Sequence, residues 1–319
     1  METTCPGSKP RIGISACLLG ERVRFDGGHQ RDAFLVDWLG PHVEWVPVCP
    51  ELEIGLGSPR EPLRLVGDPE HPRLVGTRSG ADFTRTMQQW AACRLAELTD
   101  LDGFILKKNS PSCGLFRVRV YNDRGVAERT GQGIFARVLL ERFPWLPVEE
   151  EGRLRDVAIR EHFIERVFVR WRWRTWVERA PTPHRLIRFH TAHKLILMAH
   201  SPSFLARLGC LVAEAGRRWP EALLEYAQLL PRALQAPASR PRRANALAHL
   251  MGFLRDQLSR EDRQELAEVI EGYRQGRFPL IVPMMLLRHH LRRTSLPAWI
   301  HQQAFLDPYP EELGLWNLI

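Results

Sequence analysis

Short apolar runs alternate with a helical pattern over the first half of the chain. Residues 11–19 and 43–49 are rich in β-branched side chains and are bounded by Gly or Pro, which is typical of strands. Residues 83–98 carry apolar side chains at helical spacing, and residues 104–106 and 118–121 have the apolar character of further strands. This order predicts an α/β domain in which helices flank a small sheet.

The pattern changes near residue 152. The proline-containing segment 143–147 and the acidic run Glu149–Glu151 resemble a domain boundary, and the pattern after them is helical almost throughout. Apolar residues between 163 and 171 mark one helical face, and Ser259 to Asp262 has the form of a capping box. We therefore expect an α/β domain over residues 1–152 and an all-α domain over residues 153–319, with no internal repeat of fixed period.

Composition supports a globular chain of two domains. The 319 residues are 44% hydrophobic and 26% charged, which excludes a disordered protein. The first residues lack an apolar stretch of signal-peptide length, and the longest apolar run, 278–287, is about half a bilayer span and contains two prolines. We predict a cytoplasmic protein without a membrane segment; the sequence leaves its oligomeric state unknown.

The positive charge lies in the second half of the chain. Residues 1–155 hold 21 basic and 21 acidic side chains, whereas residues 156–319 hold 24 and 16, so the net charge of +8 belongs to the predicted helical domain. A neutral domain joined to a basic one favours a chemical module attached to a domain that meets a polyanion. A basic surface with no partner is the alternative.

Three of the six cysteines stand at equivalent places. Cys17, Cys49 and Cys113 each come at or after the end of a predicted strand. In a parallel sheet those ends share one crevice, so three thiols would meet there and could bind a soft metal centre. The close pairs of a structural zinc site and the run of a ferredoxin are absent, and three thiolates without a fourth suit an iron–sulfur cluster with one open iron. The alternative is three small buried hydrophobic side chains.

Polar residues surround these cysteines. Glu51 follows Cys49 and is a candidate general base, while Ser110 and Ser112 could hold a water or a substrate carbonyl. Lys107 and Lys108 could neutralise an anionic ligand. The later Gly131-Gln-Gly133 lacks the third glycine of a phosphate loop and is predicted as a turn.

These segments resemble a known family. The matching motifs are Cys17-Leu-Leu-Gly20, Cys49-Pro-Glu51, Lys107-x-x-Ser-Pro-Ser-Cys-Gly114 and Thr130-Gly-Gln-Gly133. In this order they resemble the thiouracil desulfurase (TudS) family over about residues 10–150. The resemblance implies an oxygen-sensitive 4Fe-4S cluster bound by the three cysteines, with one iron open to the thiocarbonyl sulfur of a thiolated pyrimidine. It gives Glu51 and one loop serine acid/base and water-positioning roles; we favour Ser110, with Ser112 as the alternative.

The basic half carries candidate RNA contacts. Arg166, Arg170 and Arg174 are spaced four apart among tryptophans, which suits phosphate contacts with base stacking; the alternative is an amphipathic helix with a tryptophan core. A second segment, 190–194, ends in Lys194, and its two histidines favour a core or RNA-facing position over a metal site. Residues 160–319 are similar to the helical domain found behind TudS-like domains, a pairing that resembles the RudS type of desulfidase acting on 4-thiouridine in tRNA.

Together these features predict a tRNA 4-thiouridine desulfidase. It would remove sulfur hydrolytically, without redox change, to give uridine and hydrosulfide, with 4-thiouridine-containing tRNA as partner. One alternative is a desulfurase of free thiouracil or thionucleosides. The other is a non-catalytic RNA-binding protein whose cysteines hold a structural metal.

Overall fold

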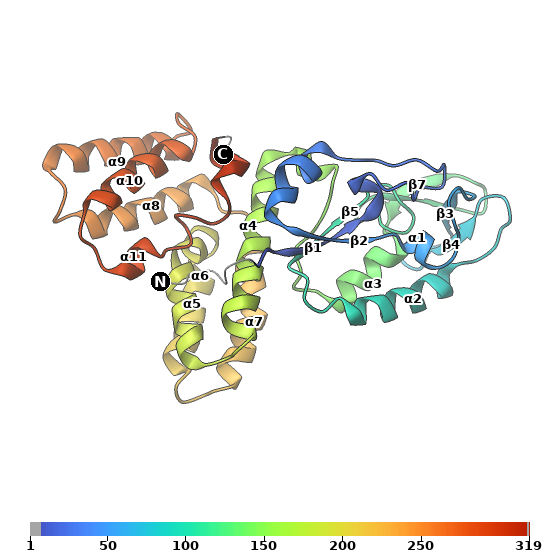
Figure 1. Cartoon of the computed structure of the whole chain (residues 1–319), viewed down its shortest axis with the longest axis horizontal. Coiled ribbons are helices and arrows are strands. Elements are labelled where there is room, and N and C mark those ends of the chain that lie inside the picture. Colours follow the sequence, from blue (N-terminus) through green and yellow to red (C-terminus); the bar gives the residue numbers. More distant parts are fainter. Residues whose placement is uncertain (1–7, 318) are drawn as a thin grey trace. The chain divides into compact units, whose positions relative to one another are not determined.

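The chain forms two units, the first α/β and the second helical, which confirms the predicted fold class (Figure 1). The structure is a computed structural model that describes residues 8–317 and 319, so Cys5 lies outside the described residues. The first unit spans residues 9–156 and the second begins at Val157.

The first sheet is parallel and has the strand order β2-β1-β5-β8 (Figure 1). Its strands are β1 (Arg11–Ser15), β2 (Glu44–Val48), β5 (Gly103–Leu106) and β8 (Val148–Glu150). The apolar runs at 43–49 and 104–106 were thus predicted correctly as strands. In β1, Gly13 allows the ring of Phe104 to pack against the backbone, since an added Cβ would lie 2.3 Å from that ring.

The first predicted strand is shorter than expected. Residues 11–15 are extended, but the next four residues form a 3-10 turn, η1 (Ala16–Leu19), which Gly20 ends with a φ of 100°. The segment is apolar throughout, and a continuous apolar run cannot distinguish a buried strand from a buried turn. The turn matters because it carries Cys17.

The acidic run Glu149–Glu151 belongs to the first sheet. Two of its residues lie in β8, and all three side chains are buried, at 5–9% exposure. The run thus ends the last strand of the first unit, and the division between the units follows it, at residues 156–157. Buried carboxylates need partners, and Glu150 accepts hydrogen bonds from the backbone amides of Leu115 and Phe116, at 2.8 and 3.1 Å.

A second, mixed sheet completes the α/β core. Its order is β4-β3-β6-β7, from β3 (Leu63–Val66), β4 (Arg73–Gly76), β6 (Val118–Tyr121) and β7 (Ala127–Gly131). Helices α2 (Thr84–Glu97) and α3 (Ile134–Arg142) lie side by side and share one hydrophobic core with both sheets (Figure 1). The predicted helix over 83–98 is confirmed as α2.

The segment Gly131-Gln-Gly133 is not the isolated turn that we expected. Gly131 ends β7, and Gly133 is the residue before the first turn of α3. A Cβ on Gly133 would lie 2.4 Å from the carbonyl oxygen of Ser112, so glycine is required for this approach. The first amides of α3 then bind the Ser110–Cys113 loop, with Phe135 N 3.0 Å from Ser112 O.

The second unit is built from helices. They are α4 (Val157–Trp173), α5 (Pro183–His200), α6 (Pro202–Glu214), α7 (Glu221–Ala233), α8 (Arg240–Leu254), α9 (Arg260–Arg274), α10 (Ile281–Arg293) and the short α11 (Ala298–His301). The predicted apolar face of residues 163–171 is buried in α4. The predicted capping box is confirmed at α9, where the Ser259 hydroxyl accepts a bond from Asp262 N at 3.0 Å. Among the described residues, no helix combines the length and apolarity needed to cross a bilayer.

Buried charges join the helices of this unit. Glu161 in α4 pairs with Arg243 in α8 at 2.5 Å, and Glu165 in α4 pairs with His200 in α5 at 2.6 Å. All four residues are at most 6% exposed. The tyrosine hydroxyl of Tyr309 donates to Glu161 at 3.2 Å, which brings the C-terminal segment into the same network.

Acid should destabilise the helical unit through three histidines, of which His193 is fully buried and His162 and His190 are half-buried. Burial lowers the pKa of His162 and His190 to about 4 and that of His193 to about 3, from 6.5. Between these values and 6.5 the unfolded chain binds more protons, so stability falls as the pH drops below about 6.5, by up to about 1.4 kcal/mol per pH unit for each histidine. Denaturant midpoints measured near pH 7.5 and pH 5 should differ, and the His193→Gln variant should show a smaller difference. Equal wild-type midpoints would contradict this expectation.

Candidate functional site

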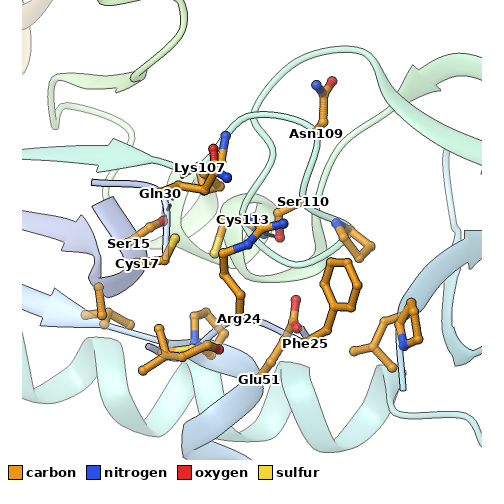
Figure 2. Close-up of a pocket in the computed structure, with 18 of the residues that line it drawn as sticks. Ser15, Cys17, Arg24, Phe25, Gln30, Glu51, Lys107, Asn109, Ser110 and Cys113 are labelled. Carbon is orange, nitrogen blue, oxygen red and sulfur yellow. Dashed lines mark hydrogen bonds between the residues drawn. The ribbon is translucent and has the colours of Figure 1, made fainter. Parts of the chain in front are cut away.

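Three strands of the parallel sheet each deliver one cysteine to a single cavity. Cys17 lies on η1 after β1, Cys49 precedes the short helix α1 (Pro50–Glu53) after β2, and Cys113 lies in the loop after β5. All three line a cavity of about 480 Å³, a size typical of small-molecule sites. Figure 2 shows Cys17 and Cys113 beside one another, with Glu51 further along the cavity.

The environment of the cysteines keeps them protonated when no cation is bound. Burial raises the pKa of Cys17 to about 11, although the nearby Lys107 opposes the shift. Burial also raises the pKa of Cys49 and, most strongly, that of Cys113; the negative charge of Glu51 adds to the effect at both, and that of a neighbouring thiolate adds to it at Cys17 and Cys113. The three side chains are therefore close enough to affect one another electrostatically, and a bound cation would favour their thiolate forms.

A buried acid directly after β8 holds the loop that carries Cys113. Glu151 forms an ion pair with the ammonium of Lys107 and accepts a bond from the Lys108 amide at 2.7 Å. The Lys107 amide donates to the hydroxyl of Ser15 at 2.9 Å, which ties the loop to the end of β1. The charge of Lys107 is thus already balanced by Glu151 within the fold. The position of Lys107 is explained without the anionic ligand that we expected it to neutralise.

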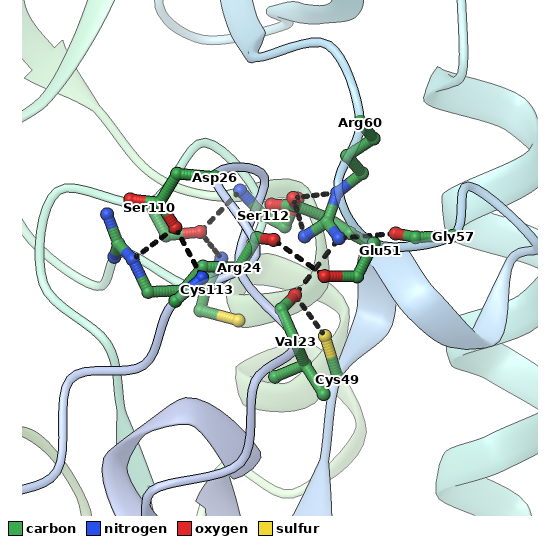
Figure 3. A network of polar contacts seen from close by, with 12 residues as sticks. Val23, Arg24, Asp26, Cys49, Glu51, Gly57, Arg60, Ser110, Ser112 and Cys113 are labelled. Carbon is green, nitrogen blue, oxygen red and sulfur yellow. Dashed lines mark hydrogen bonds and ion pairs between the residues drawn. The ribbon is translucent and has the colours of Figure 1, made fainter.

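Glu51 is held in a fixed orientation beside the cysteines. Its Oε2 accepts two bonds from Arg60, at 2.6 and 3.0 Å, and its Oε1 accepts one from the Ser112 hydroxyl at 2.9 Å (Figure 3). Arg60 also donates to the carbonyls of Val23 and Gly57, at 3.0 and 2.7 Å. Since each carboxylate oxygen can accept two bonds, Oε1 keeps one position for a further donor such as water.

The two loop serines occupy different environments. Ser112 is fully buried, does not line the cavity, and uses its hydroxyl to position Glu51. Ser110 lines the cavity, and its oxygen accepts bonds from the amides of Ser112 and Cys113 at 3.2 and 3.1 Å. Of the two, Ser110 is the one whose side chain faces a ligand in the cavity.

Sequence reasoning missed several residues of this site. Arg60 holds Glu51, and Arg24, Phe25 and Gln30 line the cavity (Figure 2). None of them belongs to a recognisable motif. A partly buried carboxylate such as that of Glu51 needs a cationic partner, and this need could have pointed to an arginine. The sequence does not say which arginine it is.

The predicted RNA contacts of α4 are not an open row of arginines. Arg174 is buried, at 8% exposure, and lies in the π-helical turn Arg174–Glu178 that follows α4. Arg166 and Arg170 are half-buried, and Arg170 pairs with Glu178 at 2.5 Å. The expectation that the stripe faces phosphates was wrong for Arg174, since the tryptophan-rich face and its neighbours lie in the core.

Lys194 and the adjacent histidines also lie within the packing of the helical unit. The Lys194 ammonium stands 4.1 Å from the centre of the Trp299 ring and 5.5 Å from that of Phe253. His193 is fully buried and stacks on Phe189, which confirms its core position.

The donor set was compared with the metal centres that it could hold. Over residues 8–317 and 319, no three His, Cys, Asp or Glu side chains converge closely enough for a single metal ion. In an iron–sulfur cluster each cysteine binds a different iron, so the sulfurs surround the group and do not meet at a point. Three thiols from three strand ends, around one cavity, fit this second arrangement; those of Cys17 and Cys113 are buried and that of Cys49 is partly exposed.

Comparisons with known proteins agree with this architecture. Residues 12–151 match the 2-thiouracil desulfurase family, and residues 194–310 match a family described as a protein of unknown function, DUF1722. The chain therefore belongs to the 2-thiouracil desulfurase family and combines that domain with a DUF1722 domain. The expected family is thereby confirmed.

Two curated relatives and one solved structure are similar to this chain. The uncharacterized protein YbgA of Escherichia coli (strain K12) is 30% identical over 141 residues, which cover 43% of this chain and 82% of the relative. The uncharacterized protein YbbK of Bacillus subtilis (strain 168) is 35% identical over 157 residues, covering 46% and 99%. The solved structure of TudS, a [4Fe-4S]-dependent thiouracil desulfidase, shares 34% identity over 48% of this chain and 98% of that one, with a TM-score of 0.37.

Proposed function

We propose that this protein is a cluster-dependent desulfidase that removes sulfur from 4-thiouridine in tRNA, in the cytoplasm. The observation that carries the proposal is the set of three cysteines around one cavity, with the bonded Glu51 carboxylate beside them. Membership of the 2-thiouracil desulfurase family supports a thiolated uracil as the reacting base. The net reaction exchanges the thiocarbonyl sulfur for the oxygen of water and releases hydrosulfide, so no electron is transferred.

Cys17, Cys49 and Cys113 would hold a 4Fe-4S cluster through their thiolates. With three protein ligands, the bound cluster supplies one iron as a soft Lewis acid for the sulfur of the substrate. The cysteines come from elements that the parallel sheet fixes relative to one another, so the protein sets the position of that iron.

The side chains of the cavity provide the acid/base chemistry. Glu51 Oε1, with one free lone pair, accepts a proton from the attacking water, while Arg60 and Ser112 hold the carboxylate in place. The Ser110 hydroxyl lines the same cavity and is placed to orient the water or the base.

The helical unit supports an RNA substrate over a free base. The net charge of +8 belongs to residues 156–319, and a free base offers no anionic groups for such a surplus, whereas tRNA does. A 4-thiouridine stacked in folded RNA cannot reach a recessed cavity, so we propose that the base leaves the stack to react. The pairing of the two domains resembles that of the RudS type of tRNA desulfidase.

Anaerobic turnover tests the proposed function. After reconstitution with iron and sulfide, the protein should remove the thionucleoside absorbance of 4-thiouridine-containing tRNA and release an equal amount of sulfide. Protein without the cluster is the control and should be inactive. Turnover of free thiouracil with none of tRNA would overturn the RNA assignment, and RNA binding without sulfide release from either would overturn the enzymatic one.

A further inference from the structure

A second cavity lies directly beside the cysteine cavity in the α/β unit. It has a volume of about 450 Å³ and shares four lining residues with the first cavity. The shared residues are Pro62, Leu63, Asn109 and Pro111. These four residues form the boundary between the two cavities, so a ligand that occupies both would cross it. Figure 2 shows that the side chain of Asn109 points away from Cys113.

Three arginines from adjacent strands line the second cavity. Arg64 lies on β3, Arg119 on β6 and Arg129 on β7, and all three are exposed. Arg119 and Arg129 are paired directly across the strands. Arg64 and Arg119 each stand one residue before the paired positions Leu65 and Val120 of two parallel strands, so they too are neighbours.

This row of like charges lacks acidic partners in the fold. Like charges directly opposite one another destabilise a sheet. Over the described residues, none of the three arginines forms an ion pair, whereas Arg73 on the neighbouring strand β4 pairs with Asp82 at 3.6 Å. The contact that the structure gives Arg64 is with the ring of Tyr121, at 5.6 Å, which also lines the cavity. A bound anion would relieve the repulsion.

The spacing of the row fits two successive phosphates. Adjacent strands lie about 4.8 Å apart, so three neighbouring strands place the arginine Cα atoms over about 10 Å. One phosphate group accepts the fork of one or two guanidinium groups, and a row of this length exceeds what a single phosphate can contact. A polynucleotide backbone offers phosphates in succession.

We propose that Arg64, Arg119 and Arg129 bind the phosphodiester backbone of the RNA strand that carries the thiolated base. The strand would lie across the outer face of the second sheet, and the base would pass Asn109 and Pro111 into the cysteine cavity. The inference rests on the proposed function, because it takes the cysteine cavity as the site of the base. It places an RNA contact on the desulfurase domain itself, in addition to the basic helical unit.

Two triple variants test the site in the full-length protein. The first is Arg64→Gln, Arg119→Gln and Arg129→Gln. The matched control is Arg85→Gln, Arg124→Gln and Arg142→Gln, which removes the same charge from exposed arginines of the same unit that line neither cavity. Affinity for 4-thiouridine-containing tRNA is measured by fluorescence anisotropy over a series of salt concentrations. With the cluster loaded, kcat/KM is measured on the tRNA, on 4-thiouridine 5′-monophosphate and on free thiouracil.

The site predicts a specific pattern of losses. The first variant should bind tRNA about 10- to 100-fold more weakly at low salt, and its salt dependence should be shallower by about 1.4 in logarithmic slope, the amount expected for two phosphates of a single strand. Its ratio of kcat/KM on tRNA to that on thiouracil should fall accordingly. The control variant should change these quantities far less.

Other results would separate the alternatives. Equal affinity and slope in both triple variants would overturn the site. If the first variant loses as much kcat/KM on 4-thiouridine 5′-monophosphate as on tRNA, the arginines bind the phosphate of a single nucleotide. That result would overturn the proposal of an RNA strand. If the wild type releases no sulfide from any substrate but the first variant still loses tRNA affinity, the RNA site stands and the proposed function fails.

Discussion

Replacement of Cys17, Cys49 or Cys113 by alanine, one at a time, should abolish both cluster binding and desulfidation. Each cysteine comes from a different strand end, so no neighbouring thiol can take the place of the one removed. Loss of one of three ligands would leave two irons without a protein ligand in a cavity that water can enter. We expect loss of the brown absorbance after anaerobic reconstitution and a fall in turnover of at least about 1,000-fold.

The chain contains its own controls for this experiment. Cys93 and Cys210 are free and exposed, and neither lines the cavity. Cys93→Ala and Cys210→Ala should therefore bind the same amount of iron as the wild type and retain its turnover. Full iron content and activity in any of the three cavity variants would show that the cluster is held by another set of ligands.

Glu51→Gln should separate cluster binding from catalysis. Glutamine has nearly the same shape: its amide oxygen can accept the bonds from Arg60 and its amide nitrogen can donate to the Ser112 hydroxyl, but it cannot take a proton from water at neutral pH. General base catalysis contributes about 100- to 10,000-fold, so we expect kcat to fall by that factor while the absorbance of the cluster stays unchanged. Single-turnover sulfide release, measured beside the iron content, gives both quantities from one preparation.

A glutamate outside the site serves as the comparison. Glu97 lies at the end of α2 and pairs with Arg94 at 2.8 Å, away from the cavity. Glu97→Gln should have wild-type activity. If Glu51→Gln also keeps its activity, the proton acceptor is another group, and the bonds of Glu51 to Arg60 and Ser112 serve only to connect the loops.

Much of the α/β fold could be predicted from local patterns, and the exceptions share a physical cause. Strand β2 and helix α2 were found because their apolar residues follow the period of the element, and strand β5 because it is a short continuous apolar run. Strand β7 lies at a sheet edge with four exposed residues, so it has no apolar alternation to recognise. Strand β8 contains buried glutamates, and charge in a sequence is ordinarily a sign of a solvated segment.

The residue types of the candidate site could be predicted from the sequence, but the contacts between their side chains could not. Three cysteines after three strands were enough to expect a shared site, because parallel strands end at one edge. The different environments of Ser110 and Ser112 depend on side-chain direction in a loop, and the two residues are only two positions apart. The pairing of Glu51 with Arg60 depends on the turns between them, which local propensities do not specify.

The pairing of β8 with β5 makes the geometry of the cysteine cavity depend on the length of the connection between α3 and β8. Ile105 pairs with Glu149 and Leu106 with Glu150, and alternate residues of a strand point to opposite faces. One residue inserted between α3 and β8 would exchange the faces of the glutamates and release the amides of Leu115 and Phe116. Residues 143–147 therefore act as a spacer for the cysteine loop: a change in their number would disturb the cysteine cavity without altering any residue that lines it.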